Sequence, residues 1–186
     1  MKDSAEQNDP KKLIELAKNG DTESFGALYE LYFTPVFRYI YRRTKNKHET
    51  EDLTKTVFLK AYRAMPRFEV REVSPLAYFF TIARNTVIQH WKKNKKALEH
   101  TKEIDTETPD SNPHPGEIAS KNEKIKIIHE AIETLTPDQQ EIVALKFIEG
   151  LPNQEIAQIL GKTEEAIRQL QCRALKTLRK NYGKRK

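Results

Sequence analysis

The sequence has little of what catalysis, disulfide bonding or metal binding requires. Its 186 residues include one cysteine, Cys172, which excludes an internal disulfide and a multi-cysteine zinc site. The six glycines are not grouped, so no glycine-rich phosphate loop is present. The five histidines are scattered without metal-ligand spacing. We therefore expect no enzymatic activity, no cofactor and no bound metal.

Long hydrophobic runs are also lacking. No apolar stretch approaches the length that spans a membrane, and the N-terminal residues MKDSAEQNDPKK contain no hydrophobic signal core. With 32% charged residues, the chain is expected to be cytoplasmic, without membrane insertion. In such a reducing compartment Cys172 is interpreted as a small tolerated residue, and an oxidant-sensing thiol is the alternative.

The net charge of +6 is unevenly placed along the chain. Residues 1–96 carry 19 Lys and Arg against 12 Asp and Glu, residues 97–120 carry 1 against 6, and residues 121–186 carry 13 against 9. The acidic middle segment has several prolines, few apolar residues and no periodicity, which favours a flexible linker. Two basic modules on a tether are typical of a protein that touches nucleic acid at two places.

The C-terminal module contains the spacing of a helix-turn-helix. Thr136 and Gln139 predict a capping box that opens a helix in which Ile142, Leu145 and Ile148 face inward. A short helix over 153–160 follows, and after a break Thr163 caps a longer helix. The small Ala157, the glycine Gly161 and the β-branched Ile167 are spaced as such a motif requires.

That spacing alone leaves an ordinary helical hairpin equally open, and the opposite face of the last helix favours DNA. This face carries Glu165, Arg168, Gln169, Cys172 and Lys176, with Arg173 and Arg179 at its flank. Arginine and glutamine at the start of such a helix reach guanine and adenine edges, while basic side chains further along the helix contact phosphates.

The N-terminal module is predicted to be a run of helices after a disordered start. A short helix covers 11–18, Asp21 caps the next up to Pro35, and another continues from Val36 to a basic run at 42–45. Asn46 opens a helix that ends near 65–66, with Leu53, Val57, Ala61 and Ala64 as its stripe. The last helix opens at 74–75, and Phe79, Ile82, Ala83, Thr86, Val87 and His90 face inward.

The outward face of that last helix resembles a surface for single-stranded nucleic acid. It presents Tyr78, Thr81, Arg84, Asn85, Ile88 and Gln89, followed by Trp91 and a lysine cluster. Bases stack on rings and ammonium groups neutralise phosphates. The alternative is that Tyr78 and Trp91 are core or boundary residues, which periodicity favours for Trp91, and that the lysines are only a solvated face.

Four motifs of this module resemble conserved region two of bacterial sigma factors. They are EDLT at 51–54, VFLKAYR at 57–63, PRF at 66–68 and IARN at 82–85. Residues 131–179 resemble region four of the same family. Because no region-three domain lies between them, the chain resembles the extracytoplasmic-function group.

The resemblance implies an all-α fold of two small helical domains, joined by a flexible linker, with the helix-turn-helix in the second. The expected divisions are a disordered 1–10, a region-two domain at 11–96, an acidic linker at 97–120 and a region-four domain at 121–186. The family binds core RNA polymerase through the β′ clamp coiled coil and the β flap, recognises promoter DNA and melts it. An anti-sigma factor is a further implied partner.

The resemblance also implies site residues by position. Polymerase would be bound by Asp52, Leu53, Lys55, Thr56, Phe58, Leu59 and Tyr62, with Phe58 as an exposed aromatic anchor. The minus-ten element would be met by Arg67, Tyr78, Thr81, Arg84, Asn85, Ile88, Lys92 and Lys93. The minus-thirty-five element would be read by Thr163, Glu164, Glu165, Arg168, Gln169, Cys172, Arg173 and Lys176.

The sequence departs from the family pattern at three places. Lys55 and Thr56 stand where many relatives have Gln-Glu, Tyr78 stands where tryptophan is usual, and 73–75 replaces a more polar loop.

Two other classes of protein stay open beside a sigma factor. One is a stand-alone helix-turn-helix regulator that binds duplex DNA without polymerase, and the other is an adaptor without DNA contacts.

Overall fold

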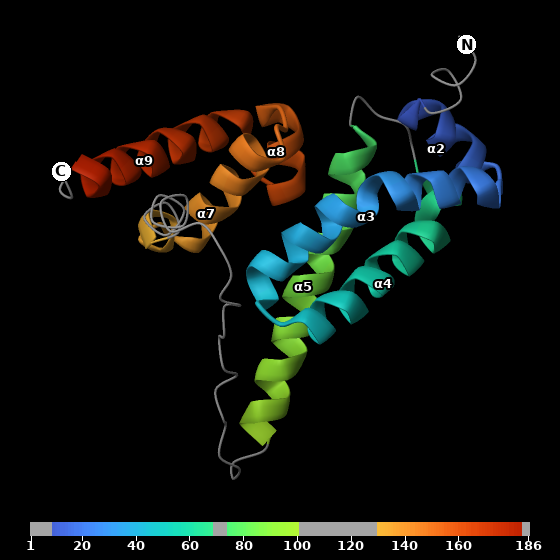
Figure 1. Ribbon diagram of the computed structural model, residues 1–186, viewed down its shortest axis with the longest axis horizontal. Helices are drawn as coiled ribbons and strands as arrows, with labels where there is room; N and C mark the ends of the chain where they lie inside the picture. Colours follow the sequence, from blue (N-terminus) through green and yellow to red (C-terminus); the bar gives the residue numbers. More distant parts are fainter. Residues whose placement is uncertain (1–8, 69–73, 101–129, 184–186) are drawn as a thin grey trace, which may run out of the picture.

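The computed structural model describes residues 9–68, 74–100 and 130–183, and within these ranges the regular elements are all helical (Figure 1). The predicted all-α fold is therefore confirmed. The first module contains α2 (Pro10–Lys18), α3 (Thr22–Thr44), α4 (Lys47–Ala64), the 3-10 turn η1 (Met65–Arg67) and α5 (Pro75–His100). The second contains α7 (Pro137–Val143), the π-helical turn η2 (Ala144–Ile148), α8 (Asn153–Leu160) and α9 (Glu164–Gly183).

The predicted helix caps are present in the structure. The Asp21 carboxylate accepts a hydrogen bond from the backbone N–H of Glu23 at 3.3 Å, and Asn46 Oδ1 accepts one from Glu49 at 3.1 Å. Thr136 forms the complete capping box, since its own N–H donates to Gln139 Oε1 at 3.1 Å. These side chains satisfy backbone donors that a helix start leaves unpaired, so the starts follow from local sequence.

Three helix boundaries differ from the predicted ones. Pro10, expected in a disordered start, is the first residue of α2, where its missing N–H is harmless. α3 runs through Pro35 without ending, because Leu28 and Val36 on either side of it are both buried. α5 continues to His100, four residues into the expected linker, where Ala97, Leu98 and Glu99 are good helix formers. The rest of the predicted linker, residues 101–120, lies outside the described residues.

Helices α3, α4 and α5 build the core of the first module. The predicted inward residues Leu53, Val57 and Ala61 of α4 are buried, although Ala64 at its end is exposed. The Phe58 ring lies 4.6 Å from the Tyr29 ring and 5.2 Å from the Phe79 ring, centroid to centroid. Packing of this kind supplies most of the stability of helices in a folded protein.

The helix-turn-helix of the second module has its predicted geometry. Gly161 adopts a left-handed conformation with φ +63°, which ends α8 sharply and strains any residue with a Cβ. Ala157 and Ile167 are both buried at the contact of α8 with α9. The Thr163 hydroxyl accepts a hydrogen bond from the Ala166 N–H at 3.2 Å and caps α9.

One inward residue of this module was predicted wrongly. Ile142 and Leu145 are fully buried, but Ile148, three residues further on, is half exposed. The π-helical turn η2 is the reason, since its wider turn shifts the phase of the side chains after Leu145. The same shift leaves Phe147 57% exposed.

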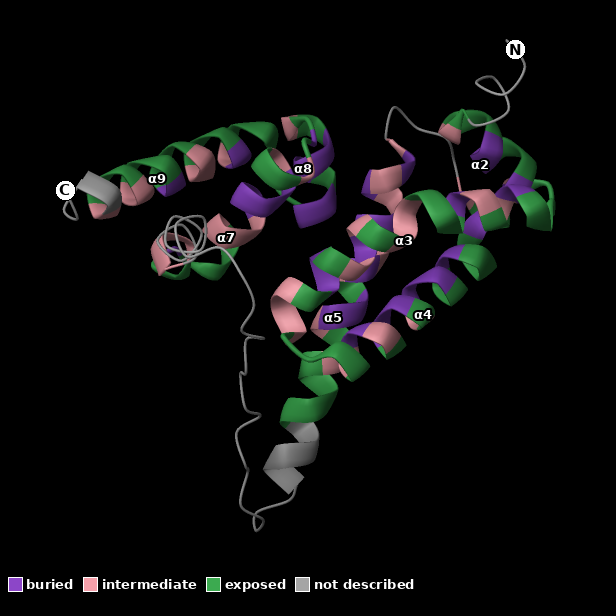
Figure 2. Cartoon of the chain, viewed as in Figure 1, coloured by how far each residue is buried: buried purple, intermediate pink, exposed green. Residues whose placement is uncertain are grey.

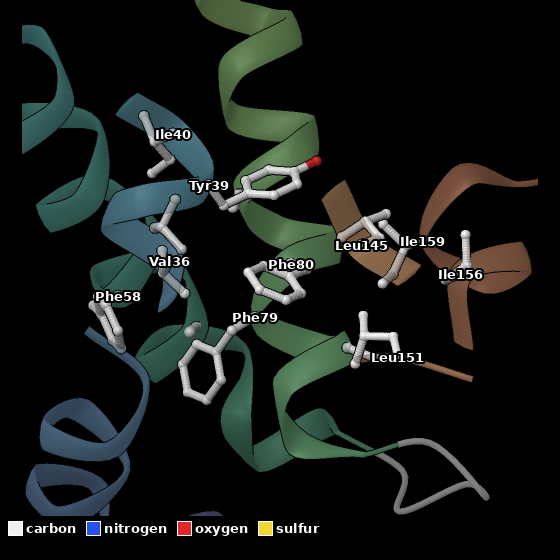
Figure 3. Packing of buried hydrophobic residues seen from close by; sticks show 14 of the residues in the cluster. Val36, Tyr39, Ile40, Phe58, Phe79, Phe80, Leu145, Leu151, Ile156 and Ile159 are labelled. Atoms are coloured by element: carbon white, nitrogen blue, oxygen red, sulfur yellow. The ribbon is translucent and has the colours of Figure 1, made fainter. Parts of the chain in front are cut away.

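The two modules pack against each other. Buried apolar residues of both belong to one continuous cluster, in which Tyr39 and Phe80 of the first module lie beside Leu145, Leu151 and Ile159 of the second (Figure 3). α5 and α8 are in direct contact. Figure 2 shows buried residues on α8 and exposed residues along α9. The modules, expected to act at two separated places, are docked in this structure.

Candidate DNA- and polymerase-binding surfaces

The predicted minus-thirty-five residues form one exposed face of α9. Thr163 and all seven other predicted residues are exposed, from the helix start to Lys176. Arg168 pairs with Glu164 at 3.5 Å and with Glu165 at 3.8 Å on its own helix. Such exposed pairs contribute about 0–1 kcal/mol, so a guanine edge can compete for the guanidinium.

The orientation of this face is set by a polar pair that the sequence did not reveal. Asn153 on α8 and Gln171 on α9 exchange two hydrogen bonds, with Gln171 Nε2 to Asn153 Oδ1 at 2.9 Å and Asn153 Nδ2 to Gln171 Oε1 at 3.4 Å. Both side chains are half-buried. Two amides eighteen residues apart carry no local pattern, so only the fold identifies this contact.

The predicted minus-ten residues divide between open and covered positions. Asn85, Lys92 and Lys93 on α5 are exposed, as is Arg67 in η1. Thr81, Arg84 and Ile88 are half-buried, as is Tyr78. The loop residues 69–73 lie outside the described residues. Trp91 is 45% exposed beside the lysines, which places it at the boundary rather than in the core.

Tyr78 does not project outward as predicted. Its hydroxyl donates a hydrogen bond to the Ala61 carbonyl at 3.1 Å, and its ring lies 4.3 Å from the Phe68 ring. Burial raises the pKa of Tyr78 to about 12. The outward position was wrong because Phe68, just before the loop, folds onto this side of α5, and periodicity within α5 cannot show that.

Arg84 lies near a carboxylate of the second module. Its Nε lies 3.7 Å from Glu141 Oε1, and its side chain is 27% exposed. The same carboxylate receives the Tyr39 hydroxyl at 2.6 Å and an Arg43 guanidinium nitrogen at 2.9 Å. Burial raises the pKa of Tyr39 above its usual range, so the phenol remains a donor. Arg84 is therefore only weakly paired within the protein, because its buried Nε has no hydrogen-bond partner.

The predicted polymerase-binding residues on α4 are only partly on the surface. Asp52, Lys55, Leu59 and Tyr62 are exposed and Thr56 is half-buried. Leu53 and Phe58 are buried, and Phe58 is only 3% exposed. The interpretation of Phe58 as an exposed anchor is wrong, because α3 covers that side of α4 with Tyr29 and Phe33.

A further apolar surface on the second module was not predicted. It is a groove lined by Ala131, Ile132, Val143, Phe147, Ile148, Leu175, Leu178 and Arg179. We call it the α7–α9 groove. Phe147 is exposed there because it lies in the π-helical turn η2. The periodicity of the sequence does not indicate such a turn. An open apolar groove of this kind is typical of a surface that receives a partner helix.

Among the described residues, no group of three or more His, Cys, Asp or Glu side chains is placed to hold a metal ion. None of the described helices has both the length and the apolar character required to cross a membrane.

An exposed helix-turn-helix beside a second helical module with a lysine-rich helix defines a DNA-binding protein of two modules. Comparison with known families identifies which. Residues 28–97 match the family model of Sigma-70 region 2, and residues 125–178 match that of Sigma-70, region 4. The chain belongs to the sigma-70 family, within its extracytoplasmic-function (ECF) group.

Individual relatives are similar along most of this chain. It is 38% identical to the ECF RNA polymerase sigma factor BldN of Streptomyces coelicolor over 90% of its length, and it covers 63% of that relative. It is 31% identical to the ECF RNA polymerase sigma factor SigX of Bacillus subtilis, covering 84% of that protein. The sigma factor RpoE of Bartonella quintana, solved with the anti-sigma factor NepR, has the same fold at a TM-score of 0.69 and 20% identity, over 87% of this chain and 98% of that one.

Proposed function

We propose that this protein is a sigma factor that binds core RNA polymerase in the cytoplasm, recognises promoter DNA and helps to melt it. The observation that carries the proposal is that one chain folds both sigma regions and leaves one face of α9 exposed. This face, with Arg168, Gln169, Arg173 and Lys176, is called the reading face. Arg168 and Gln169 lie in the second turn of α9, where side chains enter the major groove. Arg173 and Lys176 lie further along, where phosphates are met.

The exposed side of α4 is the proposed contact with the β′ clamp coiled coil. Leu59 and Tyr62 supply apolar surface there, and Asp52 supplies charge near them. Lys55 lies 3.3 Å from Asp52 and partly neutralises it, which is a consequence of the lysine that stands in place of the family's glutamine. Aromatic and aliphatic side chains that stay exposed after a core has formed are suited to a partner.

The α7–α9 groove is the proposed contact with the β flap. Its lining is apolar apart from Arg179, and Phe147, Ile148 and Leu175 are each about half exposed to solvent. It lies on the same module as the reading face of α9. Binding polymerase at this groove would place α9 over duplex DNA upstream of the start site.

The exposed end of α5 is the proposed contact with the melted minus-ten element. Asn85 offers an amide to a base, and Lys92 and Lys93 lie two turns further along, where a strand's phosphates would pass. Tyr78 supports this surface from beneath rather than stacking on a base, since its hydroxyl is bonded to α4. An anti-sigma factor is a further proposed partner.

Run-off transcription with purified core polymerase on genomic fragments tests the function. Transcripts that depend on this protein and start at defined promoters would support it. A stand-alone regulator would instead shift duplex DNA in a gel without polymerase and give no new transcripts. An adaptor would bind a partner independently of salt and would not bind DNA at all. Co-purification from cells would reveal an anti-sigma factor.

A further inference from the structure

Lys60 of α4 lies across the seam between α4 and α5 and binds two side chains of α5. The two helices are in direct contact (Figure 1). The Lys60 ammonium donates a hydrogen bond to Thr86 Oγ1 at 3.2 Å and another to Gln89 Oε1 at 3.0 Å. Thr86 is 3% exposed, so the first of these bonds fixes the ammonium against α5. Residues 86 and 89 are three apart on the helix, so one ammonium reaches both.

The bond to Lys60 determines how the Gln89 amide is turned. An ammonium has donors and no acceptor, so it binds the amide oxygen and not the amide nitrogen. The carbonyl end of the amide is therefore held toward α4. Gln89 is exposed, and its Nε2 donors have no hydrogen-bond partner in the described part of the chain. A glutamine held in this way offers donors to a ligand, whereas a free amide offers a donor and an acceptor together.

Gln89 lies in the middle of the exposed side of α5 that carries the proposed minus-ten contact. Asn85, Gln89 and Lys93 are spaced four residues apart and are all exposed, so they follow one another along one side of the helix. Successive members are about 6 Å apart along the helix axis. A DNA strand that places a base at Asn85 and a phosphate at Lys93 therefore passes Gln89 between them.

We propose that Gln89 contacts a base of the melted minus-ten element and that Lys60 sets which bases it accepts. The inference rests on the proposed function, because it requires single-stranded DNA to lie along α5. A free glutamine binds adenine through two hydrogen bonds, one accepted from the N6 amino group and one donated to N7.

The hold on the amide oxygen changes this preference. With its oxygen bound to Lys60, Gln89 donates to a carbonyl oxygen of the base and does not form the paired bonds to adenine. Thymine, guanine and cytosine each have such an oxygen and adenine has none, so adenine is disfavoured at this position. Lys60 is thus a positioning residue, because it acts on DNA sequence through Gln89.

Lys60 also carries a charge that acts on every sequence. Among the described residues no carboxylate forms an ion pair with it, so the ammonium attracts phosphates as well as holding the amide. Loss of this charge lowers affinity for all promoters alike. Only a change in base preference therefore reports the positioning role.

The experiment selects active promoters from a library with a randomised minus-ten element, using the full chain bound to core polymerase. The wild-type complex should reject adenine about tenfold at one position. Gln89→Ala should remove that discrimination and leave the preferences at the other positions unchanged. Gln89→Glu, which has acceptors and no donor, should turn the preference at that position toward adenine and cytosine, whose amino groups donate.

Lys60→Met tests the positioning role. It frees the Gln89 oxygen, so acceptance of adenine at the same position should rise about tenfold. In a Gln89→Ala background the same change should not alter base preference. Lys60→Arg keeps donors at this place and should keep the rejection of adenine. Lys93→Met is the matched control, since it removes a lysine charge from the same surface, and it should lower the yield of all sequences alike.

Several results would overturn the proposal. Unchanged base preferences in Gln89→Ala would show that Gln89 does not contact a base. A Lys60→Met profile equal to that of Lys93→Met would show that Lys60 contributes charge alone. A wild-type complex that selects no promoter would overturn the proposed function and this inference with it. A wild-type complex that selects promoters but accepts adenine at every position would overturn this inference alone.

Discussion

Gln171 of α9 donates a hydrogen bond to Asn153 of α8 at 2.9 Å and accepts one from it at 3.4 Å. This reciprocal amide pair joins the two helices of the helix-turn-helix next to the buried Ile167. It sets the angle at which α9 leaves α8, and therefore where Arg168 and Gln169 point.

Gln171→Ala should therefore loosen the reading face. Removing one partner leaves the half-buried Asn153 amide without its bonds, which costs about 1 kcal/mol of stability. Affinity for a minus-thirty-five duplex should fall further than this loss of stability explains, because α9 loses its fixed angle. Thermal unfolding and duplex titration measure the two effects. Gln158→Ala, at an exposed glutamine of α8, is the control, and equal losses in both variants would contradict a positioning role.

Arg168 and Lys176 should separate specificity from affinity. Arg168→Ala should cost roughly 1–3 kcal/mol and relax preference at one base pair, because arginine reads a base edge bidentately. Lys176→Ala should weaken all promoters alike and lower the salt slope by about one, because one phosphate contact is lost.

Selection from a randomised upstream element, with wild type and with each variant, measures these preferences. Unchanged base preference in Arg168→Ala would mean that the guanidinium stays with Glu164 and Glu165, as it does in the free protein.

Phe58 and Leu59 should behave differently although they are neighbours. Phe58→Ala should destabilise the first module by about 3–5 kcal/mol, since it leaves a cavity among packed rings. Leu59→Ala should leave the unfolding free energy almost unchanged and weaken binding to core polymerase, because its side chain is exposed on the proposed contact. Denaturant unfolding and pull-down with core polymerase distinguish them. If a folded Leu59→Ala protein bound core polymerase as well as wild type does, the polymerase contact would not lie on this side of α4.

Stability should fall at alkaline pH. Burial raises the pKa of Tyr32 and of Tyr78 to about 12 in the folded chain, whereas an unfolded tyrosine titrates at about 10. Unfolded molecules then hold fewer protons than folded ones, so the free energy of unfolding decreases as pH rises above about 10.

Denaturant unfolding at about pH 8 and about pH 11 measures this decrease. Tyr78→Phe should reduce the decrease, and Tyr41→Phe, at an exposed tyrosine of α3, should keep the wild-type value. An equal decrease in wild type and Tyr78→Phe would rule out the buried phenol of Tyr78 as a source of it.

Local sequence determined the helices and the helix-turn-helix. Asp21, Asn46 and Thr136 cap helices because each places a side-chain oxygen next to backbone donors two or three residues away. Gly161 ends α8 because a left-handed residue is needed there. These interactions span only a few residues, so spacing alone reveals them, and the motifs that identify the family lie within the same helices.

Tertiary structure decided which side of each helix is covered. Phe79 and Phe80 are adjacent and equally apolar, yet Phe79 packs on Phe58 within the first module, while Phe80 packs on Tyr39 and also reaches Leu145 and Leu151 of the second (Figure 3). Phe58 is covered by Phe33 of α3, and Arg84 lies near Glu141 of α7. Both contacts join residues that are far apart in the sequence. A helix with two apolar sides does not by itself determine which elements pack on it. The free energy gained by burying each side depends on which distant element covers that side.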